Sequence, residues 1–399
     1  MPSASRAEDA PYSLWSILLV TLILSYPLAV LLQANFGNAV YLAYASIGVT
    51  VLSCAAIAFR SPRRFGRLLL VMLAIAAFIG CFLLSGKWYV PEKLTTLLGV
   101  IAVFGLLPGF ALSSDELRRH LVPALIAIGC VTTFFLLVGG VAHAAGRVSA
   151  GDNNPIWVGR LAAYLIIAGA YCISLPSFRK VQLGIALCMV GVAAVIMTGS
   201  RGPLIAGIAA IAVSAIFFAR IGGATKLFIV LLAMTALTAL LGYDLLPQGR
   251  ALGIFDPTGD GLSGQRTLIY PYTMELIRSA PDGVGVGGFQ FHEFTYPHNI
   301  FLEALAEWGI GFGAVIILAI LASTIRLLRQ DFAYAHIIKL IAVVDLINAM
   351  VSGDLTSPRL LYAVLILSWL MPGPARARSG VPGYRPALDA DRLRLSRPV

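Results

Sequence analysis

The residues best suited to chemistry lie in the segment 296–311, which reads Tyr-Pro-His-Asn-Ile-Phe-Leu-Glu-Ala-Leu-Ala-Glu-Trp-Gly-Ile-Gly. Pro297 is of the type that starts helices, so we expect His298 in the first turn of a helix at the water interface. The positive end of the helix dipole would keep its imidazole neutral there. Because a neutral imidazole can accept a proton from a hydroxyl group, His298 is the candidate general base. The alternative is an ordinary interface residue at a helix start.

Polar residues continue along the helix predicted after His298. Asn299, Glu303 and Glu307 follow at intervals of four residues, so they share one helix face. We expect this face to point into a bundle of helices, because carboxylates within a membrane avoid lipid. Asn299 and Glu303 are the candidate supporting residues. Glu303 or Glu307 would either orient His298 or stabilise helix packing.

The second candidate site is the turn at residues 198–203, Thr-Gly-Ser-Arg-Gly-Pro, between two apolar runs. Pro203 is expected to begin the following helix. The free N–H groups of that helix start, together with the guanidinium of Arg201, would form an anion site. The turn could also exist only to reverse the chain, but a reversal does not require an arginine at its apex.

Further basic residues belong to the same predicted face of the protein. Arg160 lies about a turn and a half into an apolar run, where a guanidinium needs a partner or an anionic ligand. The alternative is that Asn154 caps this helix, Pro155 starts it, and Arg160 extends outward to the interface. The other candidate cations are Lys87, Arg147 and Arg266.

A glycine-rich run, Gly-Val-Gly-Val-Gly-Gly-Phe at residues 283–289, formally matches the dinucleotide-binding pattern. No strand-helix-strand unit surrounds it, so we expect a backbone cradle or a simple loop. Residues 268–277, just before it, form an amphipathic run that could lie in the membrane interface.

These residues must be positioned by membrane helices. Charged residues make up 12% of the 399 residues and apolar residues 59%, whereas soluble domains carry about 25% charged residues. Mean hydropathy is +0.87. The composition predicts an all-α polytopic membrane protein and excludes a nucleic-acid-binding protein despite the net charge of +10. About twelve transmembrane helices are expected, at residues 13–33, 38–59, 67–86, 93–113, 120–141, 155–175, 181–199, 203–219, 226–243, 299–325, 334–353 and 357–371.

Most Lys and Arg residues fall in loops that share one side if both termini are cytoplasmic, and the positive-inside rule therefore predicts that orientation. We expect one transmembrane catalytic domain, residues 1–371, with a long outside loop at 244–297. Residues 372–399 are expected to form a basic, disordered cytoplasmic tail that contacts lipid head groups.

The ordered set of motifs resembles the superfamily of O-antigen ligases and polymerases. The resemblance rests on the Ser-Arg-Gly turn around Arg201, the glycine run at 283–289, and the His-Asn-x-x-Leu-Glu-x-x-x-Glu-x-Gly pattern from His298 to Gly309. It covers the order of features from about Arg147 to Gly311. It implies a multi-helix (GT-C-like) inverting glycosyltransferase in the bacterial inner membrane, with a periplasmic active site in lipopolysaccharide biosynthesis.

The resemblance also implies the substrates. The donor would be a glycan linked to undecaprenyl diphosphate, and the acceptor a sugar hydroxyl of lipid A-core. Because this chain has one long outside loop, a ligase is favoured over a polymerase or another oligosaccharyltransferase of the superfamily. A lipid or glycan transporter is the alternative from another class, but polar residues near the midplane of several helices, which transporters show, are nearly absent from the first five spans.

The expected chemistry follows from the residue types. As the bond to the diphosphate breaks, negative charge grows on the leaving group, and arginines can stabilise it by bidentate contacts. Arg201 is the catalytic candidate, and Arg147, Arg160, Arg266 and Lys87 are expected to help bind the diphosphate. No cofactor or metal is expected, because the acidic residues of the outside loops are scattered and the cysteines show no C-x-x-C spacing.

Overall fold

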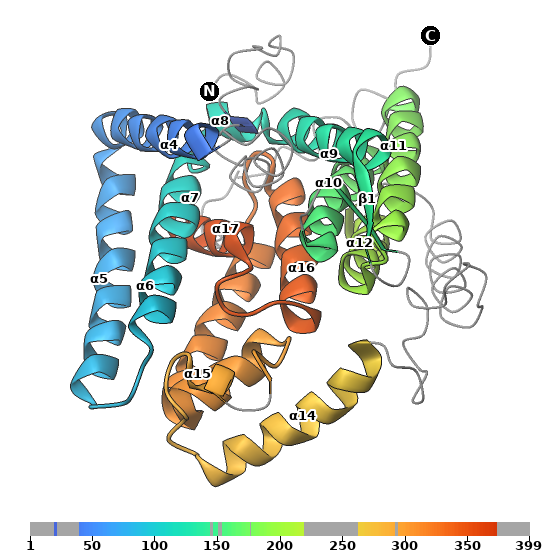
Figure 1. The fold of residues 1–399 in the computed structure, drawn as a ribbon. Helices are drawn as coiled ribbons and strands as arrows, with labels where there is room; N and C mark the ends of the chain where they lie inside the picture. The colour runs from blue at the N-terminus through green and yellow to red at the C-terminus, as the bar shows by residue number, and fades with distance from the viewer. Residues whose placement is uncertain are drawn as a thin grey trace, which may run out of the picture.

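The computed structural model describes residues 20–21, 40–143, 147–150, 154–175, 177–218, 262–291 and 294–372. These ranges are mostly helical (Figure 1). The helices are α4 (Val40–Arg60), α5 (Pro62–Leu84), α6 (Pro91–Gly99), the π-helix η1 (Val100–Leu106), α7 (Leu107–Ala111), α8 (Asp115–Arg118), α9 (Leu121–Val138), α10 (Pro155–Ile173), α11 (Phe178–Met197), α12 (Arg201–Val213), the π-helix η3 (Ser214–Phe218), α14 (Leu262–Ser279), the 3-10 helix η4 (Gly288–Phe291), α15 (Ile300–Arg329), α16 (Ala335–Val351) and α17 (Arg359–Leu370).

Every predicted span within these ranges coincides with helical structure. The predicted span at 226–243, and all of 13–33 except residues 20–21, lie outside the described residues. Within the described part, six helical stretches are long and apolar enough to cross a membrane: Pro62–Leu84, Pro91–Ala111, Leu121–Val138, Pro155–Ile173, Phe178–Met197 and Ile300–Arg329. The described part is therefore mostly helical, as predicted for a polytopic membrane protein, and the number of spans stays a prediction.

Two features differ from the sequence prediction. In Figure 1, α4 lies across the upper ends of α5 and α7 rather than alongside α5, although residues 38–59 were predicted to form a transmembrane span. The thiol of Cys54 on α4 contacts the carbonyl oxygen of Leu107 at 3.1 Å. Strands β1 (Gly140–His143) and β2 (Arg147–Ala150), which were not predicted, pair antiparallel between α9 and α10.

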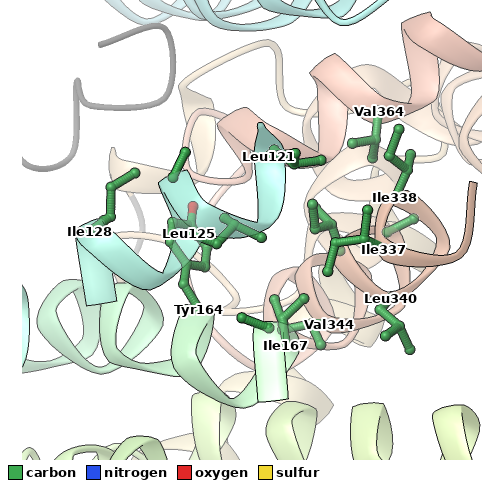
Figure 2. Packing of buried hydrophobic residues seen from close by; sticks show 14 of the residues in the cluster. Leu121, Leu125, Ile128, Tyr164, Ile167, Ile337, Ile338, Leu340, Val344 and Val364 are labelled. Atoms are coloured by element: carbon green, nitrogen blue, oxygen red, sulfur yellow. The ribbon is translucent and has the colours of Figure 1, made fainter. Parts of the chain in front are cut away.

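Helix α10 lies at the centre of the bundle, and most of its side chains are buried. In Figure 2, side chains of α9, α10 and α16 meet in one apolar cluster that includes Leu125, Tyr164 and Val344. Glycines allow α10 and α11 to pack closely: a Cβ on Gly169 would lie 2.6 Å from the carbonyl oxygen of Gly184. This close packing fixes the direction of α10, whose first turns carry Arg160.

The glycine-rich run is packed against other segments rather than free. Val284 N–H donates to the Ala306 carbonyl and Gly285 N–H to the Glu307 carbonyl. Helix α15 is kinked at Gly309 (φ 79°), where a Cβ would lie 2.4 Å from the backbone of Asp282. The run therefore holds the outer turns of α15 in place, and no strand-helix-strand unit surrounds it within the described residues.

Candidate active site

The Arg201 turn is anchored to the beginning of α10. The Ser200 hydroxyl donates to the Pro155 carbonyl oxygen at 3.0 Å and does not cap its own helix. A Cβ on Gly159 would lie 2.8 Å from the Thr198 hydroxyl oxygen. Helix α12 begins at Arg201, so the prediction that it begins at Pro203 was wrong by two residues. The guanidinium is thus carried by the first residue of a helix.

Arg160 lies about a turn and a half after the start of α10. One guanidinium nitrogen, Nη2, donates to the Ser352 carbonyl at 2.7 Å, and the side chain is only partly exposed. It lies within electrostatic range of Asp345, Asp354 and Tyr296. The capping by Asn154 is confirmed, since its side chain accepts from Ile156 N–H. The guanidinium has a protein partner, because it binds the carbonyl of Ser352 at the end of α16.

The C-terminal end of α16 connects Arg160 with the Arg201 turn. A Cβ on Gly202 would lie 3.0 Å from the Val351 side chain and 3.5 Å from the Asn348 amide oxygen and the Ser352 Cβ. Since Ser352 also receives the hydrogen bond of Arg160, the first turns of α10 and α12 meet at the end of α16. Two of the predicted stretches, distant in sequence, are therefore neighbours.

His298 is not in the first turn of a helix, contrary to the prediction. Helix α15 begins at Ile300, and His298 has a left-handed backbone with φ 57°, which is uncommon for a residue other than glycine. Its ring packs edge-on against Tyr296, with centroids 4.5 Å apart. Tyr296 in turn lies within electrostatic range of Asp354 and Arg160. The pKa of Tyr296 is raised mainly by its burial and also by the nearby Asp354 carboxylate. Tyr296 thereby links His298 to Arg160.

Asn299 has a structural role that differs from the predicted one. It is the N-cap of α15, and its side-chain oxygen accepts from the N–H groups of Phe301 at 2.9 Å and Leu302 at 3.2 Å. It therefore does not lie on the helix face of Glu303. An N-cap of this kind stabilises a helix by about 1 kcal/mol, and here it fixes the point at which the chain turns from His298 into the helix.

The predicted inward face of α15 is confirmed, because the side chains of Glu303 and Glu307 are completely buried. Both bind Lys93 of α6, whose ammonium nitrogen lies 2.6 Å from Glu303 Oε1 and 2.8 Å from Glu307 Oε1. Glu303 Oε2 accepts from Leu355 N–H at 2.8 Å. Both Glu303 oxygens are thus engaged by other groups, so Glu303 acts on the site by holding the segment after α16.

That segment, residues 352–358, was not predicted as part of the site. Gly353 has φ 84°, and a Cβ there would lie 3.0 Å from Arg160 Nη2. The Asp354 carboxylate accepts from the hydroxyls of Thr356 and Ser357. The sequence Ser-Gly-Asp-Leu-Thr-Ser-Pro, a polar break between two apolar runs, is the signal that could have found it. Lys93, near the start of an apolar run, offered a similar signal.

The remaining predicted cations are placed differently. Lys87 donates to the Asp282 carbonyl and forms an ion pair with the exposed Asp282 carboxylate at 3.5 Å. It lies beside the glycine run rather than at the Arg160–Ser352 contact. Arg147 belongs to β2 and Arg266 to α14, but their side chains lie outside the described part of the structure.

Comparison with known proteins adds one finding. Residues 184–318 match the family described as O-antigen ligase. The match supports the predicted superfamily over this part of the chain. The match includes Arg201, Arg266 and His298, but Arg160 and the segment 352–358 lie outside it. No curated protein matches the chain. The contacts around Arg160 are therefore features of this structure that the family match alone does not describe.

Proposed function

We propose that this O-antigen ligase-family protein transfers a glycan from undecaprenyl diphosphate to a sugar hydroxyl of lipid A-core at the periplasmic face of the bacterial inner membrane. The observation that carries the proposal is the meeting of three motif-bearing segments: the Arg201 turn, the start of α10 with Arg160, and the segment 296–299 with His298. The Ser200–Pro155 hydrogen bond joins the Arg201 turn to the start of α10. Tyr296, whose ring packs against His298, lies within electrostatic range of Arg160.

The proposed reaction is an inverting displacement at the sugar carbon bonded to the diphosphate. His298 takes the proton of the acceptor hydroxyl, whose oxygen forms the new glycosidic bond as the bond to the diphosphate oxygen breaks. Arg201 stabilises the charge that grows on the leaving diphosphate. Arg147, Arg160, Arg266 and Lys87 are proposed to help bind the donor. A guanidinium suits this task because it contacts two phosphate oxygens at once.

The proposed topology has about twelve transmembrane helices, cytoplasmic termini and a periplasmic site. What supports it is the shared position of the site residues at one end of the bundle. The starts of α10 and α12 meet the end of α16. The loop between α5 and α6 and the part of α15 near its label lie toward the lower end of Figure 1. Helix α14 lies obliquely across that end, and the packing of Ile277 against the cluster that includes Phe289 and Ala306 fixes it to α15.

The test is complementation of a bacterial strain that lacks its O-antigen ligase. The wild-type protein is expected to restore the lipopolysaccharide ladder on a gel, whereas Arg201→Ala and His298→Ala variants lose it at normal membrane abundance. Arg179→Ala is a matched control, because Arg179 lies in the first turn of α11, whose other end leads into the Arg201 turn. A full ladder from the His298→Ala variant would refute the general-base role.

Two further outcomes separate the alternatives. If the wild-type protein restores no ladder but converts lipid-linked single repeat units into longer chains, it is a polymerase. Transfer by purified protein in the presence of EDTA is expected to continue at its normal rate, and loss of activity that added Mg²⁺ restores would refute the metal-independent mechanism.

A further inference from the structure

A polar cluster lies between α10 and α16, deeper in the helix bundle than the Arg201 turn. The proposed chemistry uses only one of its members. It consists of Arg160 and Tyr164 on α10 and Asp345 and Asn348 on α16. Asp345 and Asn348 are three residues apart and therefore share one face of α16. Asp345 and Tyr164 both lie in electrostatic range of Arg160.

Asn348 is the least satisfied member of this cluster. Its side chain is 2% exposed, and neither its amide oxygen nor its amide nitrogen has a hydrogen-bond partner among the described residues. The Arg160 Nε–H is buried and also lacks a hydrogen bond there. Burying an amide without partners costs free energy, so the pair of unsatisfied groups indicates an occupant that supplies the missing bonds.

The position of the cluster relative to Arg201 is also defined. A Cβ on Gly202 would lie 3.5 Å from the Asn348 amide oxygen, so the cluster directly adjoins the first turn of α12. Asp345 retains accessible surface although Val344, Ile341 and Ala342 beside it on α16 are buried. Asp345 thus borders the cluster on its more exposed side, whereas the amide of Asn348 and the Arg160 Nε–H lie buried beside the arginine that is proposed to bind the diphosphate.

The chemistry of the cluster distinguishes between possible occupants. A phosphate only accepts hydrogen bonds at its ionised oxygens and would be repelled by the Asp345 carboxylate. A sugar hydroxyl both donates and accepts. It can therefore donate to Asp345 or to the Asn348 oxygen while accepting from the Asn348 amide or the Arg160 Nε–H. The mixed set of donors and acceptors fits a neutral polyhydroxyl group.

We propose that Asn348 and Asp345, with Arg160, form the subsite for the sugar bonded directly to the donor diphosphate, and so determine which first sugar is accepted. This inference rests on the proposed function. It adds a specificity-determining pair on α16, outside the family match, to the residues that bind the diphosphate.

The test compares two probes on full-length protein in lipid nanodiscs. One is a short-chain polyprenyl diphosphate that carries a single N-acetylhexosamine, and the other is the same polyprenyl diphosphate without a sugar. Wild-type protein is expected to bind the sugar-bearing probe about tenfold more tightly, the effect of one or two added hydrogen bonds. Asn348→Ala and Asp345→Asn variants should lose this preference and still bind the sugar-free probe with unchanged affinity.

Gln330→Ala is the matched control. Gln330 is also a buried amide, 1% exposed, but it donates to the Ser368 carbonyl at the opposite end of α15. This variant should keep the tenfold preference even if it unfolds at a lower temperature. Equal binding of both probes by the wild-type protein, or a preference that survives in both α16 variants, would overturn the sugar subsite alone. Failure of the wild-type protein to bind either probe would overturn the proposed function and the subsite with it.

Discussion

Replacing Lys93 by methionine should destabilise the protein strongly, because Lys93 is the shared partner of two buried carboxylates. Its ammonium lies within 2.8 Å of both Glu303 and Glu307, whose side chains are 0% exposed, while the Lys93 side chain is 15% exposed. Methionine fills a similar volume, so the substitution mainly removes the charge. Two carboxylates would then remain buried and uncompensated.

The magnitude follows from the burial of the group. Removing one partner of a buried ion pair costs about 3–5 kcal/mol. At roughly 2 °C per kcal/mol for a chain of this size, the midpoint of thermal unfolding should fall by about 6–10 °C. Glycan transfer should fall as well, because Glu303 also holds Leu355 N–H and thereby the segment that carries the acceptor of the Arg160 hydrogen bond.

The assay is thermal unfolding of purified protein in detergent, followed by intrinsic fluorescence. Lys87→Met is the matched control, since its partner Asp282 is 97% exposed and an exposed pair contributes at most about 1 kcal/mol. Adding Glu303→Gln and Glu307→Gln to Lys93→Met removes the uncompensated charges and should recover part of the loss. If the unfolding midpoints of Lys93→Met and Lys87→Met differ by less than about 2 °C, Lys93 contributes no more than a weak, solvated ion pair. That result would refute the argument that Lys93 compensates two buried carboxylates.

Two other predictions concern the outer part of α15. A Gly309→Ala substitution should destabilise the protein by about 1–3 kcal/mol, because φ is 79° and the added Cβ would meet the Asp282 backbone. The midpoint of thermal unfolding measures this destabilisation. Gly311→Ala is the control and should have little effect, because a Cβ there meets nothing within 4 Å. An equal loss of stability in the two variants would contradict the argument from the kink. In the second prediction, a His298→Gln substitution should lower the transfer rate by about 10²-fold or more at normal membrane abundance, because glutamine cannot take the proton of the acceptor hydroxyl. An unchanged rate in this variant would assign the proton transfer to another group.

Local sequence was sufficient for the helices. Apolar runs of span length predicted every helical span that the structure describes, because a backbone in hydrocarbon must satisfy its hydrogen bonds within a helix. The Asn154-Pro155 start of α10 was also predictable, since capping depends on neighbouring residues. Residue type and position alone singled out Arg201 and His298, because an arginine at the apex of an outside turn departs from the positive-inside rule and a histidine can act as a general base.

Local rules failed where a nearby residue could serve two purposes. Pro297 suggested a helix start, but Asn299 caps α15 instead, and His298 takes a left-handed backbone before the cap. The two arrangements differ by two to three residues, which is within the uncertainty of any helix boundary inferred from sequence. That small difference decides whether the imidazole lies inside the helix dipole or beside Tyr296.

The sequence by itself determined that this chain is a polytopic helical membrane protein and which residues carry its unusual charges. Only the tertiary structure decided which of those residues meet. Lys93 and Glu303 are 210 positions apart in the chain, and Arg160 and Ser352 are 192 apart. Helical periodicity fixes the face on which a side chain lies but not the helix that packs against it. The partners of Arg160, Glu303 and Asn348 therefore follow from the close packing of α10, α15 and α16.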